Sequence, residues 1–151
     1  MDKGTYCLVF RNPACTVRTG ALGNIVFRAG WHVYVGSALG SGGLKRLERH
    51  IALAGDRNRS PKWHVDYLLT NPDFQLSSAV YACMGTRMEC RVAAALGGDD
   101  VPDFGCSDCR CNSHLLYRPG DPVEEITGVF RNLGLAPVIK TIMRDEAKAN
   151  V

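Results

Sequence analysis

The chain has 151 residues, which is enough for one domain with a hydrophobic core. Hydrophobic residues make up 46% and charged residues 22%, which excludes a disordered chain, and the net charge of +3 permits a polyanionic partner without requiring one. No stretch approaches the roughly 18 apolar residues of a membrane span and the N-terminus lacks the features of a signal peptide, so we expect a cytoplasmic protein with no membrane partner.

The first quarter of the chain is rich in β-forming residues. Turn residues separate four segments that predict strands: residues 4–11, 16–18, 24–27 and 31–36. Because the connections between them are short, we expect an antiparallel meander. The meander ends on Tyr34-Val35-Gly36, and a glycine-rich connection over residues 37–43 follows it.

The rest of the chain mixes helical and strand patterns. Helices are predicted over residues 44–54, 61–70, 87–96 and 123–133, and strands over residues 76–83 and 113–117. The second helix is expected to begin at Pro61, because proline is favoured at the first helical position after a serine cap. The polar segment from about Lys140 fits either a helix or a frayed end.

This order of elements predicts an α+β fold with a small antiparallel or mixed β-sheet and flanking helices. We assign residues 1–134 to a single domain, which includes a cysteine-rich loop over residues 106–114. Residues 135–151 are assigned to a C-terminal tail. The sequence contains no internal repeat at solenoid or propeller spacing.

One series of residues has the chemistry needed to cut a phosphodiester. Hydrolysis requires a group that takes a proton from water and positive charge that offsets the charge building on the phosphoryl oxygens. Tyrosine, arginine and a carboxylate that holds Mg²⁺ supply these functions. Tyr6 lies in Gly4-Thr5-Tyr6 of the first strand, Tyr34 ends the fourth, Arg46 lies in the next helix and Glu89 opens a later helix.

This series resembles the GIY-YIG nuclease family, whose two naming motifs are matched by Gly4-Thr5-Tyr6 and Tyr34-Val35-Gly36. With Trp63-His64-Val65-Asp66-Tyr67, Glu89-Cys90 and residues 108–114, the chain is similar to a compact subfamily known as DUF123, sometimes fused to a DNA-repair glycosylase. The resemblance implies a GIY-YIG endonuclease-like fold. It also implies metal-dependent hydrolysis of DNA phosphodiester bonds in DNA repair or recombination.

Carried to this chain, the family's roles imply the catalytic residues Tyr6, Tyr34, Arg46, His50 and Glu89. The two tyrosines would face one another across the central strands, with Tyr34 as the general base. Arg46, in competition with Arg49, would contact the scissile phosphate, and His50 would be a second acid or base. Glu89 would hold a largely hydrated Mg²⁺ or Mn²⁺. The structural alternatives are core tyrosines and a carboxylate that stabilises a helix N-terminus.

The densest run of positive charge lies between residues 45 and 64, which is where we place the DNA interface. The predicted DNA contacts are Lys45, Arg49, Arg57, Arg59, Lys62 and His64. A solvated helix face is the alternative interpretation of such a run. For His64, packing beside Trp63 or a local hydrogen bond competes with a phosphate contact.

The cysteines form a separate pattern. Seven is an odd number, and without an export signal it favours reduced thiols or metal ligands over a disulfide framework. Cys106, Cys109, Cys111 and His114 offer three thiolates and an imidazole, which suit tetrahedral Zn²⁺. Structural thiols and a redox-active thiol are the other interpretations.

Two alternative functions therefore stand beside the nuclease. The first is a non-catalytic DNA-binding accessory module of the same fold that supports a repair-protein partner. The second is a zinc-binding or redox-sensing protein built on the cysteines and His114. Nothing in the sequence specifies the oligomeric state.

Overall fold

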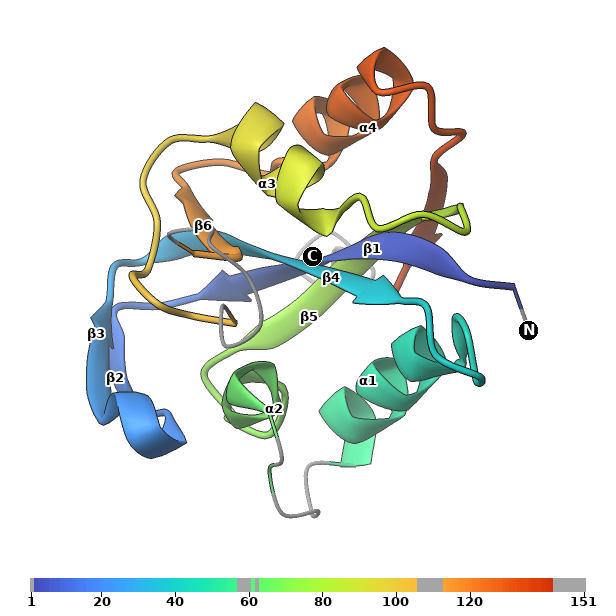
Figure 1. Ribbon diagram of the computed structural model, residues 1–151. Coiled ribbons are helices and arrows are strands. Elements are labelled where there is room, and N and C mark those ends of the chain that lie inside the picture. The colour runs from blue at the N-terminus through green and yellow to red at the C-terminus, as the bar shows by residue number, and fades with distance from the viewer. Residues whose placement is uncertain (1, 57–60, 62, 106–112, 143–151) are drawn as a thin grey trace, which may run out of the picture.

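The computed structural model describes residues 2–56, 61, 63–105 and 113–142. Its centre is a five-stranded antiparallel sheet with the strand order β6-β4-β1-β5-β7 (Figure 1). The strands are β1 (Gly4–Asn12), β4 (Gly30–Ala38), β5 (Gln75–Cys83), β6 (Leu115–Arg118) and β7 (Val138–Thr141). This architecture confirms the predicted α+β class, with an antiparallel sheet and flanking helices.

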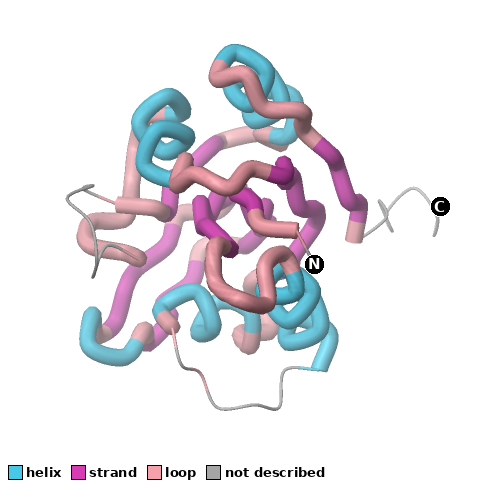
Figure 2. Tube along the Cα trace, turned by 45° about the vertical axis from the view of Figure 1, so that its right-hand side comes forward, coloured by secondary structure: helices cyan, strands magenta, loops and turns pink. Residues whose placement is uncertain are grey.

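Helices cover both faces of the sheet (Figure 1). The helices are α1 (Lys45–Asp56), α2 (His64–Leu69), α3 (Glu89–Leu96) and α4 (Val123–Asn132). The first two pack on one face and the last two on the other, and Figure 2 shows the strands between these two layers from a second direction. None of the helices in the described part of the chain has the length and apolar character needed to cross a membrane.

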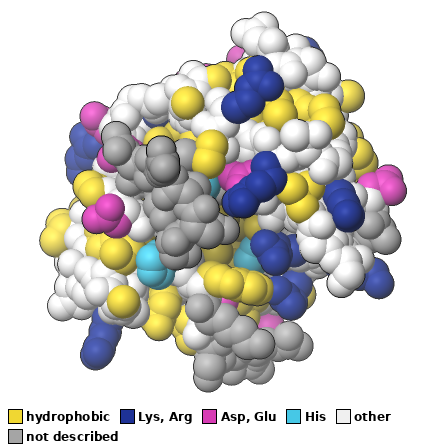
Figure 3. Space-filling model, viewed as in Figure 1, with side chains coloured by type: hydrophobic (Ala, Val, Ile, Leu, Met, Phe, Trp, Pro, Cys, Tyr) yellow, Lys and Arg dark blue, Asp and Glu magenta, His cyan; other side chains and the backbone are white. Residues whose placement is uncertain are grey.

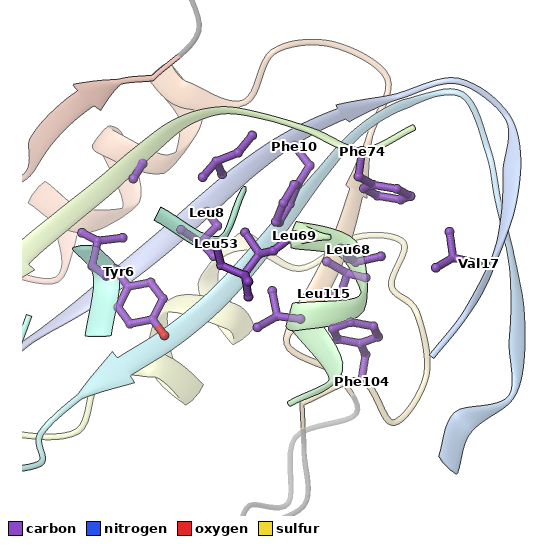
Figure 4. Packing of buried hydrophobic residues seen from close by; sticks show 14 of the residues in the cluster. Tyr6, Leu8, Phe10, Val17, Leu53, Leu68, Leu69, Phe74, Phe104 and Leu115 are labelled. Atoms are coloured by element: carbon purple, nitrogen blue, oxygen red, sulfur yellow. The ribbon is translucent and has the colours of Figure 1, made fainter. Parts of the chain in front are cut away.

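Strand β1 lies in the middle of the sheet because both of its faces are apolar. Successive side chains of a strand point to opposite faces. Tyr6, Leu8 and Phe10 therefore join the core under α1 and α2, which Figure 4 shows, whereas Cys7 and Val9 join the core under α3 and α4. The sequence prediction of a strand at this position is confirmed.

The predicted meander is wrong in its pairing. Strands β2 (Cys15–Arg18) and β3 (Asn24–Phe27) form their own two-stranded sheet, and β4 rather than β2 pairs with β1. The side-chain amide of Asn12, at the end of β1, donates to the carbonyls of Pro13 (2.8 Å) and Arg28 (3.0 Å). The chain leaves the main sheet after β1, forms the β2–β3 sheet and returns in β4. The two Asn12 bonds hold together the ends of this segment, at Pro13 and Arg28.

Helix α2 begins at His64 and not at Pro61 as predicted. The carboxylate of Asp66 accepts a hydrogen bond from the backbone N–H of Trp63 at 3.1 Å, which satisfies one of the free donors at the helix start. This contact sets the first turn of α2.

Strand β7 was not predicted, because its residues were assigned to the C-terminal tail. It pairs with β5 at the edge of the sheet, and all four of its residues are exposed. An exposed edge strand is held by backbone hydrogen bonds and lacks the apolar alternation that reveals a strand in a sequence.

Candidate functional site

The outer edge of β4 changes character at the motif Tyr34-Val35-Gly36. Strand β6 pairs with β4 from Trp31 to Tyr34, and the Val35 N–H donates to the His114 carbonyl at 2.9 Å. Beyond that bond, no strand in the described ranges pairs with this edge over residues 36–38. We call these three residues the open edge of β4, and Figure 1 shows it between α3 and α1.

The first two predicted site residues lie together beside this edge. In the register of β1 and β4, Tyr6 pairs with Gly36 and Leu8 pairs with Tyr34. Directly opposed residues of an antiparallel pair point to the same face, so Tyr6 and Tyr34 are diagonal neighbours on one face of the sheet. The resemblance implies two tyrosines that face one another across the central strands; in the structure they lie diagonally on adjacent strands.

Tyr6 is the buried member of the pair. It is 1% exposed, and its hydroxyl lies 2.9 Å from Nε2 of His50, which is 2% exposed. Burial raises the pKa of Tyr6 far above its ordinary value, and the nearby Tyr34 raises it further. Burial also lowers the pKa of His50 to about 4, although Asp66 opposes the shift. Both side chains are therefore uncharged at neutral pH.

Tyr34 is half-buried and lies where α2 meets the loop that precedes β6. Its ring packs edge-on against Phe104 at 6.2 Å between centroids, and a β-carbon on Gly105 would lie 3.1 Å from its Cε1. The Gly105 N–H donates to Nδ1 of His64 at 3.2 Å. His64, a predicted DNA contact, therefore makes a local hydrogen bond that helps to hold the loop beside Tyr34.

Two arginines of α1 lie over an exposed tryptophan next to the open edge. Trp63 is 40% exposed, and its ring centroid is 5.3 Å from Cζ of Arg46 and 4.9 Å from Cζ of Arg49. Arg46 also donates to the Ser37 carbonyl of the open edge at 3.1 Å. Both guanidinium groups are thus held by the protein and remain exposed to a ligand.

A hollow of about 380 Å³ adjoins these arginines. Its lining residues in the described part of the chain include three cations and no acid: Gly40, Ser41, Gly42, Gly43, Lys45, Arg46 and Arg49. In Figure 3, basic side chains gather in the middle of this face, between α3 and α1, around an acidic one. The surface is suited to an anion with more than one phosphate.

Glu89 begins α3, the helix that contacts β4 from the other face of the sheet. The residue is 3% exposed. Its Oε1 accepts hydrogen bonds from Nε (2.9 Å) and Nη2 (2.6 Å) of Arg87, whereas its buried Oε2 has no hydrogen-bond partner within the described part of the protein.

Contacts through His114 tie the start of α3 to β4. Cys90, the residue after Glu89, has its Sγ 3.6 Å from Nε2 of His114, whose carbonyl accepts from Val35. His114, a predicted zinc ligand, is itself buried. No group of three or more His, Cys, Asp or Glu side chains in the described ranges is placed to hold a metal ion.

The structure thus brings Tyr6, Tyr34, Arg46 and His50 together on one face of the sheet, whereas Glu89 lies in α3 on the other face. Lys45 and Arg49 lie on the adjoining helix surface. Six other predicted residues lie outside the described ranges: Arg57, Arg59, Lys62, Cys106, Cys109 and Cys111.

Two residues at the site were not predicted as functional. Asp66 lies 3.9 Å (Oδ1) from Nδ1 of His50, and Trp63 lies against both arginines. For Trp63 a signal existed, because an aromatic residue close to a cationic run is common in nucleic-acid-binding surfaces. For Asp66 there was none, since one acid in a short helix has no distinguishing pattern.

Comparison with known proteins gives one match. No curated protein and no solved structure matches the chain. The family model described as "Domain of unknown function DUF123" matches residues 5–135, a range that includes every residue of the site described above. The chain therefore belongs to the DUF123 family.

Proposed function

We propose that this protein is a metal-dependent endonuclease of the GIY-YIG type that hydrolyses DNA phosphodiester bonds. The observation that carries the proposal is the grouping around the open edge of β4. A half-buried tyrosine and an exposed arginine lie beside this edge on one face, and a buried carboxylate begins α3, which contacts β4 on the other face. These are the three groups that phosphodiester hydrolysis requires.

Tyr34 is the residue to which we assign the proton of the attacking water. A general base must reach the substrate, and Tyr34 is more exposed than Tyr6. Tyr6 keeps its proton because burial raises its pKa, and ionisation of Tyr34 raises that pKa further. The two neighbouring tyrosines therefore have different roles, one reactive and one supporting.

Arg46 is the residue to which we assign the scissile phosphate. Its bond to the Ser37 carbonyl holds the guanidinium at the open edge, and its other N–H groups remain available to fork onto phosphoryl oxygens. Arg49 and Lys45 line the adjoining hollow and would bind a neighbouring phosphate of the same DNA strand. The proposal therefore assigns the scissile phosphate to Arg46 rather than to Arg49.

Glu89 is the residue that would hold a divalent metal ion. Its Oε2 is a buried carboxylate oxygen without a hydrogen bond in the described structure, which fits a metal ligand, while Arg87 fixes the other oxygen. Mg²⁺ commonly binds through one carboxylate and keeps most of its waters, and Mn²⁺ takes similar ligands. When bound, the ion offsets phosphoryl charge and acidifies water.

The test is cleavage of duplex, nicked and branched DNA in Mg²⁺, in Mn²⁺ and with a chelator. We expect cleavage of at least one substrate that depends on the metal and is lost in the double variant Tyr34→Phe, Glu89→Gln. Cleavage no faster than that of the double variant on all three substrates contradicts the proposal.

A second candidate, a non-cutting DNA-binding module that supports a repair partner, is favoured by Trp63. An exposed indole between guanidinium groups provides a stacking surface beside phosphate contacts without any need for chemistry. This module would bind DNA with an affinity that falls as salt rises and would not cut it. The same cleavage assay, run beside a binding assay, separates the two functions.

A further inference from the structure

Three buried polar side chains form a row beneath the exposed arginines. Tyr6 comes from β1, His50 from α1 and Asp66 from α2, and they are 1%, 2% and 4% exposed. The Tyr6 hydroxyl is 2.9 Å from His50 Nε2, and His50 Nδ1 is 3.9 Å from Asp66 Oδ1. Burying polar side chains costs free energy unless they interact with one another. Three of them side by side in the core therefore point to a role beyond packing.

The Asp66 carboxylate has a fixed orientation. Its Oδ2 accepts the backbone N–H of Trp63 at 3.1 Å, and its Oδ1 lies 3.9 Å from Nδ1 of His50. A separation of 3.9 Å is longer than a hydrogen bond, so the interaction with the ring is electrostatic. A carboxylate at that distance favours an N–H on the facing nitrogen and disfavours a lone pair there.

The tautomer of His50 then decides the direction of the next hydrogen bond. With the proton on Nδ1, the other nitrogen of the neutral ring carries only a lone pair. The Tyr6 hydroxyl must therefore donate to Nε2 of His50, because the phenol O–H is then the only hydrogen-bond donor between these two atoms. The lone pairs of the Tyr6 oxygen are then free to face its diagonal neighbour, Tyr34.

We propose that Asp66 is a positioning residue, which holds His50 as the Nδ1–H tautomer and so makes the Tyr6 hydroxyl a donor to the core and an acceptor toward the site. Its consequence for catalysis rests on the proposed nuclease function. With the Tyr6 oxygen fixed as an acceptor beside it, the reactive hydroxyl of Tyr34 favours one orientation. If Tyr6 accepted from His50 instead, its O–H would be a competing donor toward Tyr34.

A purely structural role for Asp66, as the cap of α2, is separated from this one by two substitutions. Asp66→Asn keeps an oxygen for the Trp63 N–H but removes the negative charge, and its NH₂ group would then face His50 Nδ1 and favour the other tautomer. Asp66→Ala removes both the cap and the charge. If capping is the only role of Asp66, His50 in Asp66→Asn should behave as it does in the wild type. If Asp66 positions the ring, His50 in Asp66→Asn should behave as it does in Asp66→Ala.

The experiment is ¹⁵N–¹H long-range NMR of the histidine rings in the full chain at neutral pH, with the His50 signals assigned from their loss in His50→Gln. We expect the Nδ1–H tautomer in the wild type and the Nε2–H tautomer in Asp66→Asn. In DNA cleavage we expect kcat of Asp66→Asn to fall by about tenfold with little change in KM. Asp73→Asn, which changes an exposed acid, is the matched control and should leave both readouts unchanged.

The possible failures are distinguishable. An Nε2–H tautomer in the wild type, or an unchanged tautomer in Asp66→Asn, overturns the positioning role whether or not the protein cuts DNA. A reversed tautomer in Asp66→Asn with the kcat of the wild type overturns the consequence for catalysis. If the wild type does not cleave DNA at all, the nuclease proposal fails, and the NMR result alone then decides whether Asp66 positions His50 and Tyr6.

Discussion

Gly36 and Tyr6 fit together across the β1–β4 pair so closely that a β-carbon on Gly36 would lie 2.6 Å from both Cζ and Oη of Tyr6. Only glycine leaves room for a ring that lies against the backbone of the neighbouring strand. The glycine of Tyr34-Val35-Gly36 thus provides the space that the tyrosine of Gly4-Thr5-Tyr6 fills. One packing contact therefore explains one residue of each motif, Gly36 and Tyr6.

Gly36→Ala should therefore destabilise the protein by about 1–3 kcal/mol, because the Tyr6 ring must move away from its contact with His50. Urea unfolding measures the change. Gly40→Ala is the control, since a β-carbon at Gly40 has nothing within 4 Å. Equal stabilities of the two variants would show that Tyr6 does not lie against Gly36.

Tyr6→Phe should also cost about 1–3 kcal/mol, for a different reason. It removes the hydrogen-bond partner of a buried imidazole nitrogen, and an unsatisfied buried polar atom keeps its desolvation penalty. Tyr81→Phe removes a hydroxyl from a half-buried tyrosine of β5 and should change the free energy of unfolding much less. A Tyr6→Phe variant as stable as Tyr81→Phe would contradict the buried contact.

Acid should destabilise the fold before the carboxylates titrate. Burial lowers the pKa of His50 and of His32 to about 4, below the usual histidine value, so the unfolded chain binds more protons than the native protein in acid. The contribution of the two neutral, buried histidines to the free energy of unfolding is fully present above about pH 6.5 and is lost as pH falls toward 4. Each histidine should contribute about 2–3 kcal/mol to the loss.

The measurement is urea unfolding at pH 7 and pH 4.5 for the wild type and His50→Gln. The variant should lose less stability between the two pH values, and His32 should account for part of what remains. An identical pH dependence in both proteins would mean that His50 titrates normally in the native state.

DNA binding should divide into a salt-dependent and a salt-independent part. Arg46→Ala and Arg49→Ala should each lower the slope of log K against log salt by about 1, because each removes one phosphate contact. Trp63→Ala should weaken binding to single-stranded DNA by about 1–3 kcal/mol and leave the slope unchanged. Fluorescence anisotropy at several salt concentrations measures both.

Arg131→Ala is the matched control for this series. Arg131 is an exposed cation on α4, which lies on the other face of the sheet from α1. If Arg131→Ala changed the slope of log K against log salt as much as Arg46→Ala and Arg49→Ala do, a DNA interface on α1 would be contradicted.

Much of this fold could be predicted because its central elements bury apolar residues at regular spacing. Strand β1 and helix α4 carry such patterns, and the predicted ranges agree closely with the structure. Strand β7 has no apolar pattern, and the start of α2 depends on one carboxylate, so neither could be found by periodicity. The pairing of β1 with β4 joins residues distant in sequence, and the side-chain hydrogen bond from Asn12 to Arg28 that accompanies it leaves no periodic pattern.

The candidate site was predictable in its residue types and not in their roles. The motifs identified both tyrosines, but only the structure distinguishes a buried Tyr6 from a half-buried Tyr34. By sequence Arg46 was the preferred catalytic arginine with Arg49 as its competitor, and of the two Arg46 bonds to the open edge. Asp66 is recognisable only from its distance to His50.

The most direct test of the nuclease proposal is single-turnover cleavage of labelled DNA in Mg²⁺ with protein in saturating excess. Wild type is compared with Tyr34→Phe and with Glu89→Gln, and DNA binding by each protein is measured first. We predict that all three bind DNA with similar affinity and that each substitution slows cleavage by at least about 100-fold. Cleavage by either variant at the wild-type rate, or none by the wild type, would contradict this account.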